Sequence, residues 1–416
     1  MSDITEQCNN TKMSWIDKLT LYSLYSLALF SFTSTSATAL SHIFIAIPGC
    51  YYFFLQLKER VWQPSKSQLA LLGLIAISSL SIILAPDISD TLYKLTKLKY
   101  FLLGFLSIFA YQALLPKLTT KQRRLLITLF AVTITLASIS GIIGVFTGYN
   151  PLRFRAASEN VRATGMYGMS ITYGNGVMLP ALIFSGALLW YQRFEEYING
   201  KLLVAAWVST LAGMVLSLTR GAILSYLLSA PILLWRYSKR VFWIAVGIVT
   251  IILVSIFITI STMNYSSNST ARLFQPINST SNTVRISQYL AAWHAFIENP
   301  LTGVGFRNFE KHSCKIKKKH QLSHQDWCGH AHNNLLELLA GAGILGFLFL
   351  LLFHIFWFME SLARQDIWGP LLATSVAGFF LSGLFQSTII DGENMFVVMF
   401  LYGIGQVQTR WSKSTT

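Results

Sequence analysis

Charged residues are scarce in this chain of 416 residues. Asp, Glu, Lys and Arg together make up 12% of it, whereas hydrophobic residues make up 53%. An average soluble domain carries about 25% charged residues, so the composition excludes an ordinary soluble globular protein. The alternating ten-residue strands of an outer-membrane barrel are also missing, while long apolar runs recur along the whole chain. We therefore predict an all-α polytopic membrane protein.

Acidic residues are the scarcest charged class. The chain has 17 of them against 32 Lys and Arg, which gives a net charge of +15. Such a surplus can indicate nucleic-acid binding, but the cytoplasmic loops of membrane proteins also collect Lys and Arg. Given the hydropathy, we expect no nucleic-acid partner. Ionisable residues inside the apolar runs are few beyond His42 and His354, which argues against an ion-coupled transporter.

The apolar runs predict about twelve transmembrane helices. They are Leu19–Thr33, Thr38–Leu57, Leu69–Leu84, Leu98–Leu115, Leu125–Phe146, Ile171–Trp190, Leu202–Leu218, Ala222–Trp235, Val241–Ile260, Leu335–Phe358, Trp368–Ile389 and Met395–Val407. Most Lys and Arg between the runs lie at alternate junctions, on the side shared by both termini, and that side is cytoplasmic by the positive-inside rule. The prediction divides the chain into a first set of spans in residues 1–261, a large non-cytoplasmic loop domain in residues 262–333 between spans 9 and 10, and the last spans in residues 334–416.

Cysteine is rare as well, and two of the four cysteines, Cys314 and Cys328, lie in the large loop. In an oxidising compartment the pair can form a disulfide, which would stabilise the loop by about 3 kcal/mol. A zinc site is the alternative, although the spacing matches no standard zinc pattern. The histidines that surround the pair are His312, His320, His324 and His330.

Three further patterns mark the large loop. Apolar residues recur every three or four positions from Val284 to Ile297, which predicts an amphipathic helix on the membrane face that ends at Glu298-Asn299-Pro300. Gly303-Val-Gly305-Phe306 predicts a turn. It is not a dinucleotide-binding loop, because the third glycine of that motif is missing. Lys315 to Lys319 form a basic cluster that is either a solvated face or a contact for anionic lipid headgroups.

The segment from His330 to Gly346 passes from a polar loop into a long apolar helix. Asn333 or Asn334 can cap this helix. His332 then lies beside the positive end of the helix dipole, which favours the neutral imidazole that a general base needs. The alternative is an interfacial histidine that only forms hydrogen bonds.

Two arginines lie on the same non-cytoplasmic side. Arg220 occupies a tight turn between two apolar runs, so it needs an anionic partner or water; snorkelling to lipid phosphate is the alternative. Arg285 lies on the predicted amphipathic helix. Two guanidinium groups can bind a diphosphate bidentately. Together with His332 they predict glycosyl transfer from a lipid diphosphate, in which the arginines stabilise the leaving group and His332 activates a sugar hydroxyl.

An ordered set of motifs resembles the bacterial O-antigen ligases. The set comprises Leu218-Thr219-Arg220-Gly221, then Arg285 with Trp293, Asn299-Pro300 and Gly303-Val-Gly305, then His332-Asn333 and Gly343-Ile-Leu-Gly346. The resemblance implies a twelve-span inner-membrane enzyme that moves O-antigen polysaccharide from undecaprenyl diphosphate to lipid A–core oligosaccharide at the periplasmic face. It also implies a metal-independent, inverting transfer without a cofactor. Arg220, Arg285 and His332 would match the essential arginines and histidine of that family.

Other residues are candidates for substrate binding. Three of them, Arg153, Arg155 and Arg162, are candidates only because they are positively charged and lie on the predicted non-cytoplasmic side of the membrane. Asn333 is a candidate because it is next to His332. Asp391, in Asp391-Gly-Glu393, could form an ion pair with an arginine, orient the acceptor or the base, or hold a divalent metal. We expect no metal site.

The superfamily also contains O-antigen polymerases and protein O-oligosaccharyltransferases, which share the donor. Lipid A–core is a bulky amphiphile with several phosphates, so the basic residues Lys94, Lys97, Lys99 and Lys315 to Lys319 favour it as the acceptor. An alternative of another class is a lipid-linked sugar flippase, which would need a polar, arginine-lined cavity through the spans. All of these functions involve contact with membrane lipids.

Overall fold

The computed structural model describes residues 13–85, 91–159, 161–262 and 280–407. Within these ranges the chain is mostly helical, and the strands are two short ones, β1 (Tyr149–Asn150) and β2 (Arg155–Ala156), which pair in antiparallel fashion. The prediction of an all-α protein is confirmed. The greater part of the polar segment from 264 to 283, at the start of the large loop, lies outside the described residues.

The described residues form α-helices and short 3-10 helices along the whole length of the chain. In chain order they are α2 (Trp15–Phe30), α3 (Thr35–Lys58), α4 (Lys66–Ile83), α5 (Thr91–Thr96), α6 (Lys99–Leu114), η1 (Leu115–Lys117), α7 (Thr120–Thr147), η2 (Pro151–Arg153), α8 (Ser170–Leu189), α9 (Tyr191–Phe194), α10 (Gly200–Leu216), α11 (Arg220–Ser229), α12 (Pro231–Tyr237), α13 (Lys239–Thr262), α14 (Thr280–Glu298), α15 (Phe309–Lys319), α16 (Asn334–Ala363), α17 (Trp368–Gly383), η4 (Thr388–Ile390) and α18 (Gly392–Gly405).

Several helices are long and apolar enough to cross a bilayer. Among the described residues there are six of them, namely α3, α4, α6 with η1, α7, α8 and α16, while α10 is apolar but shorter. The chain is therefore a multi-pass membrane protein. The total of about twelve spans stays a prediction.

Two predicted spans differ from the observed helices. The run from Ala222 to Trp235 is divided between α11 and α12, because Pro231 starts a new helix instead of continuing the old one. The run that begins at Trp368 ends as a helix at Gly383 and not at Ile389. The residues that follow (384–391) form a turn that contains the polar residues Gln386, Ser387 and Thr388. This polar turn is hydrogen-bonded to the start of α16.

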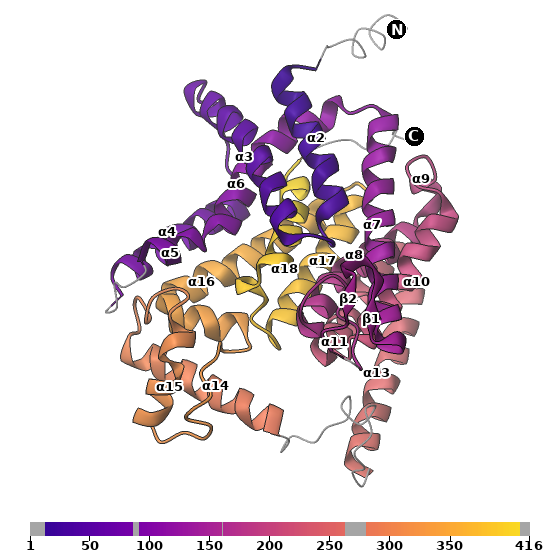
Figure 1. Cartoon of the computed structure of the whole chain (residues 1–416). Helices are drawn as coiled ribbons and strands as arrows, with labels where there is room; N and C mark the ends of the chain where they lie inside the picture. Colours follow the sequence, from indigo (N-terminus) through magenta and orange to yellow (C-terminus); the bar gives the residue numbers. More distant parts are fainter. Residues whose placement is uncertain (1–12, 86–90, 160, 263–279, 408–416) are drawn as a thin grey trace, which may run out of the picture.

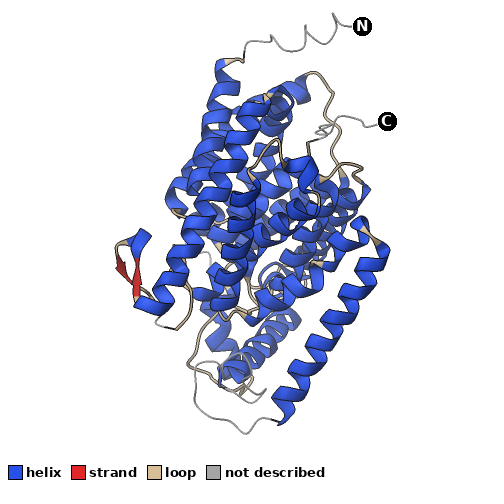
Figure 2. Cartoon of the chain, turned by 90° about the vertical axis from the view of Figure 1, so that its right-hand side faces the viewer, coloured by secondary structure: helices blue, strands red, loops and turns tan. Residues whose placement is uncertain are grey.

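The helices form a bundle with distinct ends. In Figure 1, α2 and α3 lie at the top, while α11, α14, α15 and the β1–β2 hairpin lie in the lower half. Figure 2 shows the hairpin projecting from the side of the bundle. α16 packs against α4, α17 and α14, so it connects the bundle with the helices of the large loop.

The large loop folds as its sequence predicts in two respects. The amphipathic helix is α14, which ends at Glu298. Cys314 and Cys328 form a disulfide, so the expectation of a disulfide is confirmed and the zinc alternative for these thiols is wrong. A small core of alanines on α14, with Phe309 and Ala340, holds α14 between α15 and α16.

The basic cluster from Lys315 to Lys319 is less exposed than predicted. Lys317 is buried and its Nζ donates to the carbonyl oxygens of His324 and Trp327. Lys318 pairs with Asp326 and Lys319 with Glu298, at 3.1 and 2.8 Å. These contacts hold the loop together, so the cluster as a whole is not a free surface for lipid headgroups.

α16 is broken at Gly343, whose backbone has φ 68° and ψ −166°. In an unbroken helix the carbonyl of Ala340 would accept from the N–H of Ile344. Instead, the Ala340 carbonyl accepts from Val304 N–H and the Ile344 N–H donates to the Pro300 carbonyl, both at 2.9 Å. The break therefore anchors the turn after α14 to the middle of α16. This contact explains why the two glycine motifs occur together.

Replacing Gly343 by alanine is expected to destabilise the protein by about 3 kcal/mol or more. The φ and ψ of Gly343 are accessible to essentially no other residue, and an added Cβ would lie 2.3 Å from the carbonyl oxygen of Leu301. Thermal unfolding of the purified protein measures the effect. The control is Gly247→Ala in α13, where a Cβ meets nothing within 4 Å. Equal melting temperatures for the two variants would refute the anchoring role.

Candidate functional site

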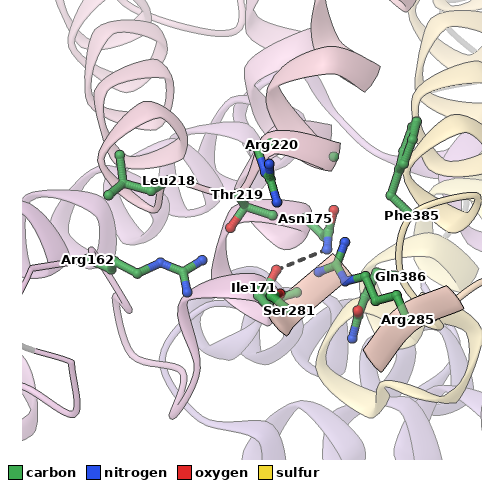
Figure 3. Close-up of a pocket in the computed structure, with 11 residues that line it drawn as sticks. Arg162, Ile171, Asn175, Leu218, Thr219, Arg220, Ser281, Arg285, Phe385 and Gln386 are labelled. Atoms are coloured by element: carbon green, nitrogen blue, oxygen red, sulfur yellow. Dashed lines mark hydrogen bonds between the residues drawn. The ribbon is translucent and has the colours of Figure 1, made fainter. Parts of the chain in front are cut away.

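A pocket of about 280 Å³ lies where the start of α11 and α14 meet the turn after α17. Figure 3 shows three arginine side chains entering it from different directions. Arg220 comes from the start of α11, Arg285 from α14, and Arg162 from the loop before α8. The rest of the lining is Ile171, Asn175, Leu218, Thr219, Gly221, Ser281, Phe385 and Gln386.

Arg220 is the first residue of α11, as the predicted tight turn requires. Leu218 adopts a left-handed conformation, with φ 51°, and lets the chain reverse between α10 and α11. Thr219 is the N-cap of α11 and its hydroxyl donates to the carbonyl of Ser170 at 3.1 Å. Arg220 Nη2 donates to Asn282 Oδ1 at 3.3 Å, which links α11 to α14. The first turn of α11 lines the pocket, so the positive end of its dipole adds to the charge there.

Arg162 is held by two partners. Its Nε donates to the carbonyl of Ser217 at 2.9 Å, and its Nη1 lies 3.4 Å from Glu159 Oε2. Only 17% of its side chain is exposed. These contacts direct the guanidinium group of Arg162 towards the pocket that Arg220 and Arg285 also line.

The other two arginines of this segment lie elsewhere. Arg153 Nη1 donates to the carbonyl of Tyr167 at 2.7 Å, and Arg155 is exposed on β2. Neither lines the pocket. Among the three arginines proposed from charge and side, the structure brings only Arg162 together with Arg220 and Arg285.

His332 reaches the pocket through Gln386. The Nδ1 atom of His332 lies 2.8 Å from Gln386 Oε1, and Gln386 Nε2 lies 3.2 Å from His330 Nε2. The two imidazole rings are 4.2 Å apart. His332 has a φ of 49°, a strained conformation that histidine tolerates better than most residues. His332 is therefore one hydrogen bond away from the arginine-lined pocket.

His332 is neutral at physiological pH. Burial lowers the pKa of its imidazole to about 4, and the neighbouring His330 and Arg285 act in the same direction. Burial together with Arg307 and Arg285 also lowers the pKa of His330 to about 4. The sequence argument attributed the neutral form to a helix dipole, but burial is the larger cause. A neutral imidazole next to a cationic pocket can accept a proton.

Asn333 caps α16, as expected for this position or the next. Its Oδ1 accepts from the backbone N–H groups of Leu335 and Leu336, at 2.9 and 3.1 Å, and its Nδ2 donates to the carbonyl of Leu384. Asn334 Nδ2 in turn donates to the hydroxyl of Thr388 at 2.9 Å. The two asparagines fasten the start of α16 to the polar turn after α17. Their contacts position His332 beside Gln386.

Asp391 lies at the start of α18 and pairs with polar side chains instead of an arginine. Asn394 Nδ2 donates to its Oδ2 at 3.1 Å, and a hydrogen bond joins it to Glu393. Burial, with the neighbouring Glu393 carboxylate, raises the pKa of Asp391 well above its ordinary value. Across the described part of the chain, no three His, Cys, Asp or Glu side chains gather closely enough to hold a metal ion.

The sequence argument missed three residues at this end of the molecule. Gln386 and His330 belong to the hydrogen-bonded chain that ends at His332. Arg307 donates to the carbonyl of Ile390 at 3.3 Å and lowers the pKa of His330. The polar run Gln386-Ser387-Thr388 inside an apolar stretch was the available signal for the first of these.

Comparison with protein families gives one match. Residues 204–351 match the family model described as O-antigen ligase. The matched segment contains Arg220, Arg285, His332 and the break at Gly343. None of the curated proteins compared with the chain matches it.

Proposed function

Because the chain belongs to the O-antigen ligase superfamily, whose members are glycosyltransferase-like enzymes, we propose that it joins an O-antigen glycan to a lipid acceptor. The donor is the glycan linked to undecaprenyl diphosphate, and the acceptor is the lipid A–core oligosaccharide. In this proposal the protein lies in the inner membrane of a bacterium. Its arginine-lined pocket faces the periplasm.

The observation that carries the proposal is the meeting of three arginines with a buried neutral histidine. Arg162, Arg220 and Arg285 line one pocket, and Gln386 in the same lining is hydrogen-bonded to His332. A diphosphate carries several negative charges on oxygens that guanidinium groups can bind in pairs. The start of α11 adds the partial positive charge of a helix N-terminus. The negative charge of a glycosyl diphosphate matches the positive charge of this lining.

The chemistry follows from these groups. The neutral His332 takes the proton of the acceptor hydroxyl, and the hydroxyl oxygen forms a bond to the anomeric carbon of the donor sugar. The bond between that carbon and the phosphate oxygen breaks, and its electron pair leaves with undecaprenyl diphosphate. Arg220 and Arg285 stabilise the charge that develops on the leaving oxygen. Attack opposite the leaving group inverts the anomeric configuration.

A flippase is a weaker candidate. A path for a lipid-linked sugar through the membrane needs polar side chains along the bundle. A second pocket, of about 110 Å³, is lined by hydrophobic residues, mostly of α7, α8, α17 and α18, including Phe130, Phe184, Leu371 and Leu401. The arginine-lined pocket instead lies at one end of the bundle. This arrangement favours transfer at a surface over transport.

An assay with defined substrates tests the proposal. Purified protein is incubated with undecaprenyl-diphosphate-linked glycan and lipopolysaccharide that lacks O-antigen. We expect the glycan to appear on the lipopolysaccharide, seen as a shift on a gel. Longer lipid-linked glycan with unmodified lipopolysaccharide would refute the ligase and favour a polymerase of the same superfamily.

Turnover is expected to persist in EDTA. The arginines supply the positive charge that many glycosyltransferases obtain from a divalent ion, and burial raises the pKa of Asp391 well above its ordinary value, which disfavours the ionised carboxylate that a metal ligand needs. The rate of transfer is measured before and after dialysis against EDTA, and again after Mg²⁺ or Mn²⁺ is added. A loss of activity that a metal restores would revive a metal role for Asp391.

A further inference from the structure

The hydrogen bond between His332 and Gln386 determines which ring nitrogen of His332 carries the proton. The Oε1 atom of Gln386 is a carboxamide oxygen, which only accepts hydrogen bonds. Since it lies 2.8 Å from His332 Nδ1, that nitrogen must carry the proton. The lone pair is then on Nε2, at the opposite edge of the ring. A general base needs this tautomer if Nε2 points at the acceptor hydroxyl.

The second imidazole contacts the nitrogen of the same amide. Gln386 Nε2 lies 3.2 Å from His330 Nε2, and an amide nitrogen donates hydrogen bonds. With His330 as acceptor on one side, the amide oxygen must face His332 on the other. A rotated amide would place its nitrogen against His332 Nδ1 and move the proton of His332 to Nε2. In the observed orientation of the amide, His330 accepts from Gln386 and His332 keeps the tautomer that can act as a base.

The backbone also restrains Gln386. Its N–H donates to the Ser382 carbonyl at 3.1 Å, and its carbonyl accepts from Thr388 N–H at 2.9 Å. The cap residue Asn333 donates to the Leu384 carbonyl, two residues before Gln386. The turn after α17 and the loop before α16 are therefore fixed to each other on both sides of the contact between the imidazole and the amide.

We infer that Gln386 is a positioning residue, which holds His332 as the Nδ1–H tautomer and directs its Nε2 towards the acceptor hydroxyl. The inference rests on the proposed function and assigns to an amide the part that a carboxylate plays in a Ser-His-Asp triad. An amide suits this site because Gln386 also lines the pocket with Arg285. A carboxylate there would pair with the arginine and repel the diphosphate.

Two substitutions test the inference. Gln386→Leu removes the acceptor, and we expect the kcat of transfer to fall at least about 100-fold while the KM for the lipid-linked donor changes little. Gln386→Glu keeps an acceptor for Nδ1–H, so kcat is expected to recover to within about tenfold of the wild type. Its negative charge offsets that of Arg285, so the KM for the donor is expected to rise.

The pH profile separates positioning from mere packing. The charged and titratable groups around His332 are His330 in its own loop, Arg285 on α14 and Glu337 on α16, with Arg307 facing His330. The Glu337 carboxylate accepts from the N–H of Ala331 and from the hydroxyl of Ser387, the neighbours of His332 and Gln386. A carboxylate at position 386 stabilises the protonated imidazole and so raises the pKa of His332. The acidic limb of the rate profile, where the base becomes protonated, is therefore expected to move to higher pH in Gln386→Glu.

The outcomes are distinct. Equal losses in both variants with an unchanged acidic limb would overturn the inference, as would a wild-type kcat in Gln386→Leu. Should Gln386→Leu fail to fold, the recovery and the pH shift in Gln386→Glu decide the matter. The control is Gln365→Leu, an exposed glutamine after α16, which should match the wild type. Absence of any transfer by the wild-type protein would refute the proposed function itself.

Discussion

Replacing His332 by alanine is expected to lower the rate of glycan transfer by about 10²–10⁴-fold, the usual contribution of a general base. The imidazole is buried and neutral, and its Nδ1 is hydrogen-bonded to Gln386, which lines the arginine pocket. The neighbouring imidazole of His330 does not replace it, because the Nε2 lone pair of His330 accepts from Gln386 Nε2. The rate is measured with purified protein and with lipopolysaccharide that lacks O-antigen as the acceptor.

The same substitution has a consequence in cells. Lipid-linked polysaccharide should accumulate while capped lipopolysaccharide disappears from gels. The matched control is His320→Ala, because His320 is a partly exposed histidine at the end of α15, where it pairs with Glu298. A normal ladder of capped lipopolysaccharide in the His332→Ala strain would remove His332 from the mechanism.

The Arg285→Lys substitution is expected to reduce transfer by about 10²–10³-fold, although the positive charge is retained. A guanidinium group binds two phosphate oxygens at once through a planar pair of donors, whereas an ammonium group binds as a point charge. The loss should appear in kcat, since the charge on the leaving oxygen grows in the transition state. Steady-state kinetics with the lipid-linked donor measure the effect.

Arg155→Lys is the control for this prediction. Arg155 is an exposed arginine of the hairpin and does not line the pocket. It should therefore keep the wild-type rate. Full activity in Arg285→Lys would mean that Arg285 contributes charge without bidentate binding, and equal losses in both variants would mean that neither contacts the donor specifically.

Features that depend on neighbouring residues were predictable from the sequence. Apolar runs between basic junctions indicated a multi-pass helical protein, and a tight turn between two such runs placed Arg220 at the start of a helix. The pair Asn299-Pro300 ended α14 where proline prohibits a further helical turn. These outcomes follow from hydropathy and backbone conformation, which a single sequence encodes directly.

Features that depend on distant contacts were not predictable. The break at Gly343 is compensated by backbone groups of Pro300 and Val304, about forty residues earlier in the chain, so α16 looks uninterrupted in the sequence. Arg153 and Arg162 have the same charge and lie on the same side, and only their tertiary partners separate them. Gln386 follows His332 by more than fifty residues and falls in a stretch that hydropathy assigns to a helix.

The side-chain partners of Asp391 were not predictable from the sequence either. The sequence allowed an ion pair between Asp391 and an arginine, yet the side-chain partners of Asp391 are Asn394 and Glu393, its close neighbours in sequence, together with Thr172 on α8. The carboxyl groups face one another because α18 begins at Gly392, directly after Asp391. Charge balance in the sequence therefore did not identify the partner of this residue.

The most direct measurement is the position of bound undecaprenyl diphosphate in a structure of the protein in lipid nanodiscs. The account predicts that the diphosphate lies among the guanidinium groups of Arg162, Arg220 and Arg285, with Nε2 of His332 open towards the space that an acceptor sugar would occupy. A diphosphate bound at the opposite end of the bundle, or beyond the reach of Arg220 and Arg285, would contradict it.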